Sequence, residues 1–271
     1  HPVAHSFPTR RSSDLATPKH YAVHSGPEPE RHRFDARVSQ KDLYETYLPA
    51  FRDAVVEGSA YSVMGAYNRT NGEPCCASPT LLQNILREAW GFEGYVVSDC
   101  GAIGDIRNHH HVTENAAESA ALAVKNGCEL NCGSTYRDLL IAVDTGLITE
   151  AELDTAVKRL FTARFKLGLF DPPERVPWAQ IPYEQNDCQA HHELARDIAR
   201  ASFVLLKNEG DLLPLSPDLK SLAVLGPNAD SLDVLLGNYF GTPSQATPLR
   251  DGIRAAVGPE TRIWYAQGSP L

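Results

Sequence analysis

Four predicted strands of this sequence end in polar residues that are capable of chemistry. These residues are Lys19-His20, Tyr67-Asn68, Ser98-Asp99 and Asn131. An aspartate can act as a nucleophile, and lysine, histidine or tyrosine side chains beside it can donate hydrogen bonds to it or to substrate hydroxyl groups. A single aspartate at a strand end is more often a turn or helix-capping residue. The chemical interpretation therefore depends on whether the four strand ends lie together.

The order of strands and helices predicts that they do. Residues 19–23 are predicted to be the end of a strand, and short strands are predicted at 61–66, 95–97 and 128–132. Amphipathic helices are predicted at 39–55, 79–90, 114–126, 136–145 and 150–167. This alternation is typical of parallel strands joined by right-handed crossovers. Four such units make half of a (β/α)8 barrel or most of a doubly wound sheet. In a barrel the carboxyl ends of the strands meet on the face that carries active sites, so the polar strand ends favour the barrel.

A proline-rich stretch divides the sequence into two domains. We predict an α/β protein in which residues 16–170 form half of a (β/α)8 TIM-type barrel, residues 171–188 form a linker, and residues 189–271 begin a second α/β sandwich domain. The second domain has predicted helices near 189–201 and 253–257 and strands near 222–226 and 262–265. Two parallel strands cannot cover both faces of a sheet, so we expect this domain to be truncated. Residues 1–15 lack periodicity, and we interpret them as a non-native leader.

Composition and charge exclude several classes of protein. The 271 residues carry a formal net charge of −9, so we expect no nucleic-acid partner, which would need clustered Lys and Arg. No apolar run approaches the ~20 residues of a membrane helix. The six cysteines lack zinc-knuckle spacing, and His109-His110-His111 point in different directions, so we expect no metal site and no cofactor. Buried free thiols are favoured for most cysteines, with Cys75, Cys76, Cys128 and Cys132 as candidates for disulfide bonds.

The most specific string of the sequence is Gly94–Ala102, GYVVSDCGA in one-letter code. It resembles the nucleophile motif of glycoside hydrolase family 3. Further segments resemble that family in the same order and spacing, namely Lys19-His20, Ser62–Pro74, Lys166–Asp171, Val204–Leu215 and Val224–Asp230. The resemblance covers about residues 16–270. It implies that the half barrel is the second half, with the first half absent.

The resemblance also implies a chemistry, that of a retaining β-glycosidase with Asp99 as the catalytic nucleophile. Such an enzyme needs two carboxyl groups about 5–5.5 Å apart, one as nucleophile and one as acid/base. Lys19 and His20 are expected to bind the sugar through hydrogen bonds. Tyr67, at a neighbouring strand end, is expected to donate its phenol to Asp99.

Further acidic and thiol side chains have roles that the sequence leaves open. Glu28 either reaches a sugar hydroxyl or is a solvated loop acid, and Cys100 lines the pocket, packs against it or is reactive. The acid/base glutamate is expected beyond residue 271, because Glu209 and Glu260 stand at the wrong places. We therefore expect this chain alone to be inactive and to fold poorly.

The pairs Asp99-Cys100 and Asn131-Cys132 resemble the β-xylosidase branch of the family more than the β-glucosidase branch. An exo-acting β-xylosidase is therefore predicted, with an oligosaccharide or aryl β-glycoside as substrate and β-glucosidase as the alternative. Readings from other classes are a Schiff-base aldolase using Lys19, a non-catalytic carbohydrate-binding fragment, and a nucleotide-binding domain, for which the GxGxxG spacing is missing. The resemblance suggests a periplasmic or secreted protein, and the oligomeric state stays open.

Overall fold

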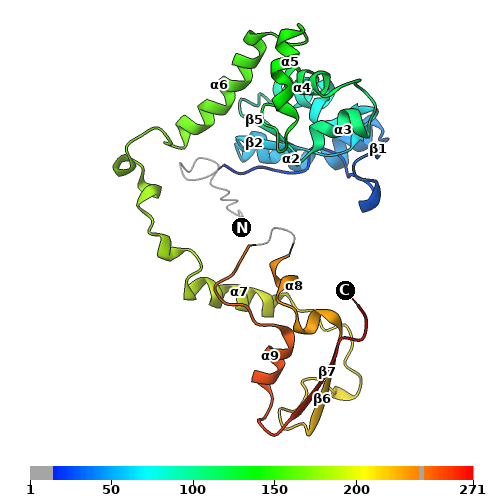
Figure 1. Ribbon diagram of the computed structural model, residues 1–271, viewed down its shortest axis with the longest axis vertical. Helices are drawn as coiled ribbons and strands as arrows, with labels where there is room; N and C mark the ends of the chain where they lie inside the picture. Colours follow the sequence, from blue (N-terminus) through cyan, green and yellow to red (C-terminus); the bar gives the residue numbers. More distant parts are fainter. Residues whose placement is uncertain (1–14, 238–240, 271) are drawn as a thin grey trace. The chain divides into compact units, whose positions relative to one another are not determined.

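The computed structural model describes residues 15–237 and 241–270, and the chain divides into two compact units (Figure 1). Unit 1 is His1–Gln180 and unit 2 is Ile181–Leu271. The division falls inside the segment 171–188, whose limits as a linker stay a prediction. The predicted leader lies outside the described residues up to residue 14.

Unit 1 is built on parallel strands that neighbour one another in chain order. Strand β2 (Ser62–Gly65) pairs in parallel with β5 (Tyr95–Ser98), placing Gly65 opposite Ser98. Tyr21 forms a parallel bridge to Gly65 on one side, and Leu130 forms a parallel bridge to Val97 on the other. Both outer segments are single bridges and so are shorter than the strands predicted at 19–23 and 128–132. A sequential order without reversal is that of consecutive units of a barrel.

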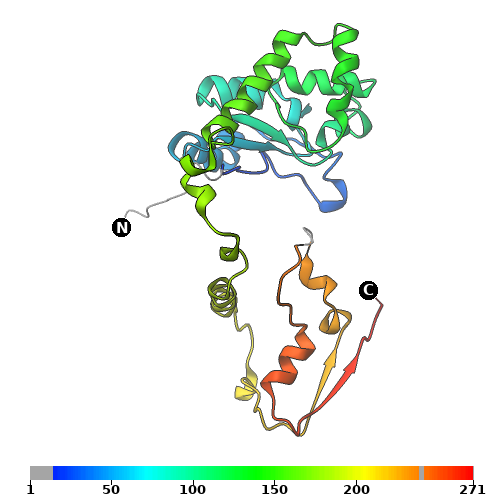
Figure 2. The ribbon, with the colours of Figure 1, turned by 60° about the vertical axis from the view of Figure 1, so that its left-hand side comes forward.

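Helices join these parallel segments and cover one side of them (Figure 2). They are α1 (Gln40–Asp42), α2 (Pro49–Arg52), α3 (Ala102–Asn108), α4 (Ala116–Lys125), α5 (Leu139–Asp144) and α6 (Glu150–Lys166), with π-helical stretches at Leu43–Tyr47, Asp53–Glu57 and Pro79–Ala89. The helix predicted at 39–55 is thus a run of short α and π turns, opened by Ser39, whose side chain accepts from the Asp42 amide. Helix α3 was not predicted from the sequence. It has seven residues, and it contains a glycine.

A small three-stranded sheet stands beside the parallel strands and was also not predicted. It contains β1 (Asp35–Ala36), which runs parallel to β3 (Arg69–Thr70), and β4 (Glu73–Pro74), which runs antiparallel to β3. Asn71 and Gly72 adopt positive φ angles of 51° and 93° at the turn between β3 and β4. A two-residue turn with both φ values positive suits the twist of a tight hairpin.

The core of unit 1 fixes the strands to the helices. The stripe predicted on the helix Pro79–Ala89 is buried, at Leu81, Leu82, Ile85 and Leu86. A buried carboxylate, Glu129, then holds the last parallel segment in place. It accepts from Arg87 Nη2 at 2.7 Å, from Arg159 Nη1 at 2.6 Å and from the Val96 amide at 2.7 Å. Removing one partner of such a buried group is costly, so these contacts make the edge of the sheet rigid.

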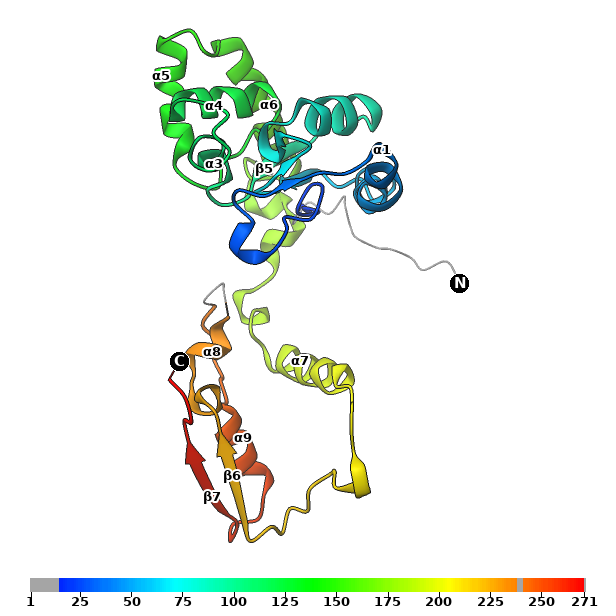
Figure 3. The same cartoon turned by 90° about the vertical axis from the view of Figure 1, so that its right-hand side faces the viewer.

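Unit 2 contains a two-stranded parallel sheet with little around it (Figure 3). Its elements are α7 (Gln189–Ser202), β6 (Ser221–Leu225), α8 (Asp233–Leu236), α9 (Leu249–Ala256) and β7 (Arg262–Ala266). Strands β6 and β7 pair from Ser221 opposite Arg262 to Leu225 opposite Ala266. Among the described residues of this unit, Val224, Ala229, Pro248 and Thr261 are buried. The stretch Phe203–Leu206 is exposed throughout.

Candidate active site

Asp99 lies at the carboxyl end of β5, directly after the buried residue Ser98. Its amide donates to the carbonyl of Gly65, the last residue of β2, at 3.2 Å. Gly101 follows with a φ of 87°, a left-handed conformation that turns the chain into α3. The strand pairing and this turn together leave the Asp99 side chain 14% exposed on the face where the parallel strands end.

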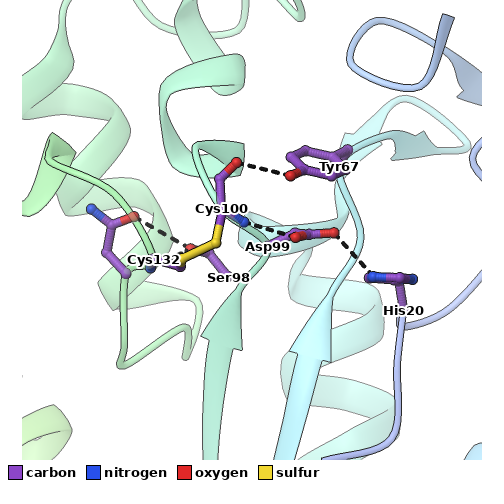
Figure 4. Close-up of a disulfide and its surroundings, with 7 residues drawn as sticks. His20, Tyr67, Ser98, Asp99, Cys100 and Cys132 are labelled. Atoms are coloured by element: carbon purple, nitrogen blue, oxygen red, sulfur yellow. Dashed lines mark hydrogen bonds and ion pairs between the residues drawn. A yellow bond between two sulfur atoms is a disulfide. The ribbon is translucent and has the colours of Figure 1, made fainter. Parts of the chain in front are cut away.

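Both carboxylate oxygens of Asp99 are oriented by neighbours (Figure 4). Oδ1 accepts from the Cys100 amide at 2.8 Å. Oδ2 lies 3.1 Å from Nε2 of His20, whose ring is partly exposed. Because an amide N–H can only donate, Oδ1 is an acceptor, and the carboxylate presents its second oxygen towards the histidine. His20 thus lies beside Asp99, although its segment pairs with β2 and not with β5.

The Tyr67 phenol lies close to both Asp99 and Cys100. The phenol donates to the carbonyl oxygen of Cys100 at 2.9 Å (Figure 4). The expected donation to the Asp99 carboxylate stays a prediction. Partial burial, followed by the negative charge of Asp99 and its capacity to accept from the phenol, raises the pKa of Tyr67 to about 12. Tyr67 therefore stays a neutral donor at the rim of the site.

Cys100 forms a disulfide bond with Cys132. Of the four cysteines suggested as disulfide candidates, Cys132 is bonded, but to Cys100. The suggestion is wrong for Cys75, Cys76 and Cys128, which are buried free thiols. The reactive-thiol interpretation of Cys100 is also wrong, because its sulfur is already bonded. The physical reason is strand adjacency: the Gly101 amide donates to the Cys132 carbonyl, so the two strand ends are in contact. Two cysteines that each follow a polar strand end were the signal in the sequence.

Lys19 and Glu28, the other predicted sugar-binding residues, have exposed side chains. Lys19 immediately precedes His20. The Glu28 carboxylate forms an ion pair with Arg31, three residues later. Their proposed contacts with a sugar stay predictions.

Three residues near Tyr67 were missed in the sequence. Asp105, on α3, is buried, and its Oδ2 lies 2.7 Å from Nδ1 of His32. The His32 ring packs on the Tyr67 ring with centroids 4.4 Å apart. The Arg31 guanidinium also lies over the Tyr67 ring, with its Cζ 5.1 Å from the ring centroid. No periodicity marks Arg31 and His32, because they stand in an irregular loop.

The three consecutive histidines take different places. His109 lies 3.5 Å from Asp105, and His110 is buried. Burial, and then the charge of Arg69, lower the pKa of His110 to about 4. Within residues 15–237 and 241–270, no three His, Cys, Asp or Glu side chains are grouped so that they could hold a metal ion. Nor does any helix in those ranges have the length and apolar character needed to cross a membrane.

Chemically, the arrangement provides a partly exposed carboxylate between a histidine and a neutral phenol. Asp99 is fixed by backbone contacts, so it can approach an electrophilic carbon without losing much conformational freedom. His20 and Tyr67 offer hydrogen bonds to the groups around that carbon. This is a suitable geometry for nucleophilic attack by a carboxylate.

Comparisons with known families give two matches along the chain. The family model described as the glycosyl hydrolase family 3 N terminal domain matches residues 8–163, and the one described as the C-terminal domain matches residues 203–266. A xylan 1,4-β-xylosidase of Xylanibacter ruminicola is 44% identical over 259 residues, which cover 94% of this chain and 30% of that protein. A β-xylosidase/α-L-arabinofuranosidase of Medicago sativa subsp. varia is 40% identical over 244 residues, covering 89% of this chain and 31% of that protein.

Solved structures give the same picture. A glycoside hydrolase family 3 exo-β-xylosidase in complex with a xylobiose aziridine probe has a TM-score of 0.82 at 34% identity, covering 95% of this chain and 34% of that one. A β-glucosidase from Listeria innocua in complex with glucose has a TM-score of 0.77 at 29% identity, covering 95% and 35%. The predicted α/β fold class is confirmed by these likenesses. The chain spans about a third of the length of the proteins it matches.

Proposed function

Because the chain belongs to glycosyl hydrolase family 3, we propose that the protein carrying it is an exo-acting, retaining β-glycosidase with Asp99 as its nucleophile. The observation that carries this proposal is the Asp99 carboxylate. It stands at the carboxyl end of β5, 14% exposed, with Oδ2 3.1 Å from His20 and Oδ1 bonded to the Cys100 amide. Hydrolysis of a terminal β-linked sugar is the reaction that suits this carboxylate.

In the proposed reaction, Asp99 attacks the anomeric carbon and the glycosidic oxygen leaves. A covalent glycosyl-enzyme forms and water then releases the sugar, so two displacements retain the anomeric configuration. The leaving oxygen needs a proton from a second carboxyl group. We place that acid/base in a part of the whole protein that this chain does not span.

The residues around Asp99 have supporting roles in this proposal. His20 and Lys19 bind hydroxyl groups of the terminal sugar, and Tyr67 donates at the rim. The raised pKa of Tyr67 keeps the phenol protonated through the working range of pH. Glu28, which is exposed beside Arg31, is proposed to contact a sugar hydroxyl.

For the substrate, we propose a xyloside in preference to a glucoside. Two features support this choice: relatives at 40–44% identity are named xylosidases, and a disulfide stands at Cys100. Many β-glucosidases of this family carry tryptophan directly after the nucleophile. The rigid Cys100–Cys132 bridge shapes the wall differently and alters the space for the hydroxymethyl group of glucose. The likeness to a solved β-glucosidase makes glucoside hydrolysis the second candidate.

Covalent trapping tests the nucleophile. The whole enzyme is incubated with an activated 2-deoxy-2-fluoro-β-xyloside, digested, and examined by mass spectrometry. We expect the added sugar on the peptide that contains Asp99. Label on a different carboxylate would refute the assignment. Borohydride trapping of a carbonyl substrate on Lys19, without any glycosidase activity, would instead support the aldolase.

A ratio of specificity constants tests the substrate. The kcat/KM of the whole enzyme is measured on matched aryl β-xyloside and aryl β-glucoside. One hydroxymethyl group in a fitted pocket is worth about 1–3 kcal/mol, so the xyloside should be favoured by roughly 10–200-fold. A strong preference for the glucoside would show that the role given to Cys100 is mistaken, while the glycosidase proposal would stand.

A further inference from the structure

A chain of three side chains packs against Tyr67 and has no part in the proposed reaction so far. Asp105 is buried on α3, six residues after Asp99. Its Oδ2 lies 2.7 Å from His32 Nδ1, and Arg31 Nε donates to the other ring nitrogen of His32, Nε2, at 3.2 Å. We refer to these three residues as the Asp105–His32–Arg31 chain.

The direction of the hydrogen bonds in this chain follows from chemistry. A guanidinium N–H can only donate, so Nε2 of His32 accepts and carries no proton. Nδ1 therefore carries the proton and donates it to the Asp105 carboxylate. One tautomer of a neutral ring satisfies both contacts, and the ring is held at both nitrogens.

His32 and Arg31 both contact the Tyr67 ring. The His32 ring lies 4.4 Å from it, and the Arg31 guanidinium lies 5.1 Å from its centroid. Arg31 Nη1 also pairs with the exposed carboxylate of Glu28. The buried acid is thus connected, through His32 and Arg31, to two of the residues predicted to meet the sugar.

The Asp105–His32–Arg31 chain connects two segments of the proposed site, the one that follows His20 and the one that follows Asp99. His32 follows the segment of Lys19 and His20, and Asp105 follows Asp99. A metal-binding role has no support, since no group of potential ligands of sufficient size occurs in the described ranges. A purely packing role does not explain why each ring nitrogen has its own polar partner.

We infer that His32, fixed by Asp105, is a positioning residue that holds Arg31 against Tyr67 and so sets the position of the Tyr67 ring near Asp99 and that of the Glu28 carboxylate. This inference rests on the proposed function. Its consequence is a specific kinetic effect. Loss of the His32 acceptor should weaken the grip on the sugar while Asp99, which has its own backbone contacts, keeps its place.

The test compares two substitutions of similar length in the whole enzyme. His32→Gln supplies one donor and one acceptor, as the ring does, and His32→Met supplies neither. On an aryl β-xyloside we expect His32→Met to raise KM about 10-fold or more with kcat within about 3-fold, and His32→Gln to stay within about 3-fold of the parent in both. Melting temperatures of both variants verify that the fold is intact.

Substitutions at the exposed end of the chain keep the inference testable even if His32→Met unfolds. Arg31→Met should raise KM. The double variant with Arg31→Met and His32→Met should have the same KM as Arg31→Met alone, because both substitutions remove the same contact, that between Arg31 and His32. Arg33→Met is the matched control, since Arg33 pairs with Glu30 in solvent and should leave KM unchanged.

The outcomes separate this inference from the function beneath it. An unmodified enzyme with no β-glycosidase activity would refute the proposed function. An active enzyme in which His32→Met leaves KM unchanged, or in which His32→Gln and His32→Met raise it equally, would refute the positioning role alone. Fully additive effects of Arg31→Met and His32→Met would refute it as well.

Discussion

The two units carry similar sequence patterns but bury them to different degrees. In unit 1, the apolar stripe of the helix Pro79–Ala89 is covered, and Leu82 has 0% of its surface exposed. In unit 2, the stripe of α7 is open, and Ile198 is 60% exposed. Leu206, in the extended stretch after α7, is 91% exposed.

This difference teaches that a periodic pattern predicts a helix more securely than it predicts the helix's partner. The spacing decides which side chains share a face, but another segment must cover that face. Covering a leucine is worth roughly 1.5–3 kcal/mol, which α7 does not gain here. A cavity of ≈ 390 Å³ lined by Leu222 and Ile253, between β6 and α9, shows the same loose packing.

The largest expected effect concerns this chain on its own. Expressed as residues 16–271, it should give no measurable turnover on an activated aryl β-xyloside and should self-associate. The proposal places the acid/base partner of Asp99 outside this chain, and exposed apolar surface such as that of α7 favours association. Turnover assays and analytical ultracentrifugation measure the two properties. A soluble monomer with full turnover would contradict both the expected inactivity of this chain and the expectation that the exposed apolar surface of unit 2 causes self-association.

The next effect concerns where the chemistry lies. In the whole enzyme, Asp99→Asn in unit 1 should lower kcat by roughly 10³-fold or more, about 4 kcal/mol of barrier, because a carboxamide is a poor nucleophile. The melting temperature should change little. Glu209→Gln in unit 2, an exposed carboxylate, is the matched control and should leave kcat within about 2-fold. Equal losses from both substitutions would place essential chemistry in both units.

Hydrogen exchange measures the contrast in packing directly. Amides of β5 should exchange at least about 100-fold more slowly than those of α7, since exchange of α7 needs no opening of a buried core. The measurement is mass spectrometry of peptides from the chain after timed labelling, at a protein concentration that keeps it monomeric. Similar protection of α7 and β5 would show that unit 2 is as well packed as unit 1.

The smallest effect is a pH dependence. Burial lowers the pKa of His110 to about 4, so between about pH 4 and 6.5 the unfolded state binds more protons than the folded state. Stability is therefore lost as the pH falls through that window, by at most about 3 kcal/mol. His110→Phe should reduce this loss, measured as the difference in unfolding free energy of the whole protein between pH 7 and 4.5. The exposed His191 of unit 2 is the control. If His191→Gln reduced the loss of unfolding free energy as much as His110→Phe does, the explanation would be contradicted.

Much of the fold could be predicted, because its helices and strands follow local periodicity. The buried stripe at Leu81–Leu86, strand β5 and the parallel pair β6–β7 lie where the sequence places them. Helix α3 and the hairpin β3–β4 were not predicted, since each is too short to repeat a pattern.

The candidate site was predictable to a similar extent. Asp99 and Tyr67 come together because they follow the paired strands β5 and β2, and His20 joins them because it precedes Tyr21, which bridges to the end of β2. The partner of Cys100 and the contacts of His32 depend on which strand ends and loops become neighbours in space. Spacing along one sequence does not contain that information.

The bridge between Cys100 and Cys132 has a mechanical consequence. The two cysteines are 32 positions apart, and α3 and α4 lie on the covalent ring that they close. Tension applied to the chain ends would pass through the sulfur atoms and leave the ring unloaded. A fully stretched chain would then be shorter by about 100 Å, at roughly 3.3–3.6 Å for each residue inside the ring. Asp99 is the last residue before this ring, so the proposed nucleophile is bonded directly to the residue at which the covalent ring closes.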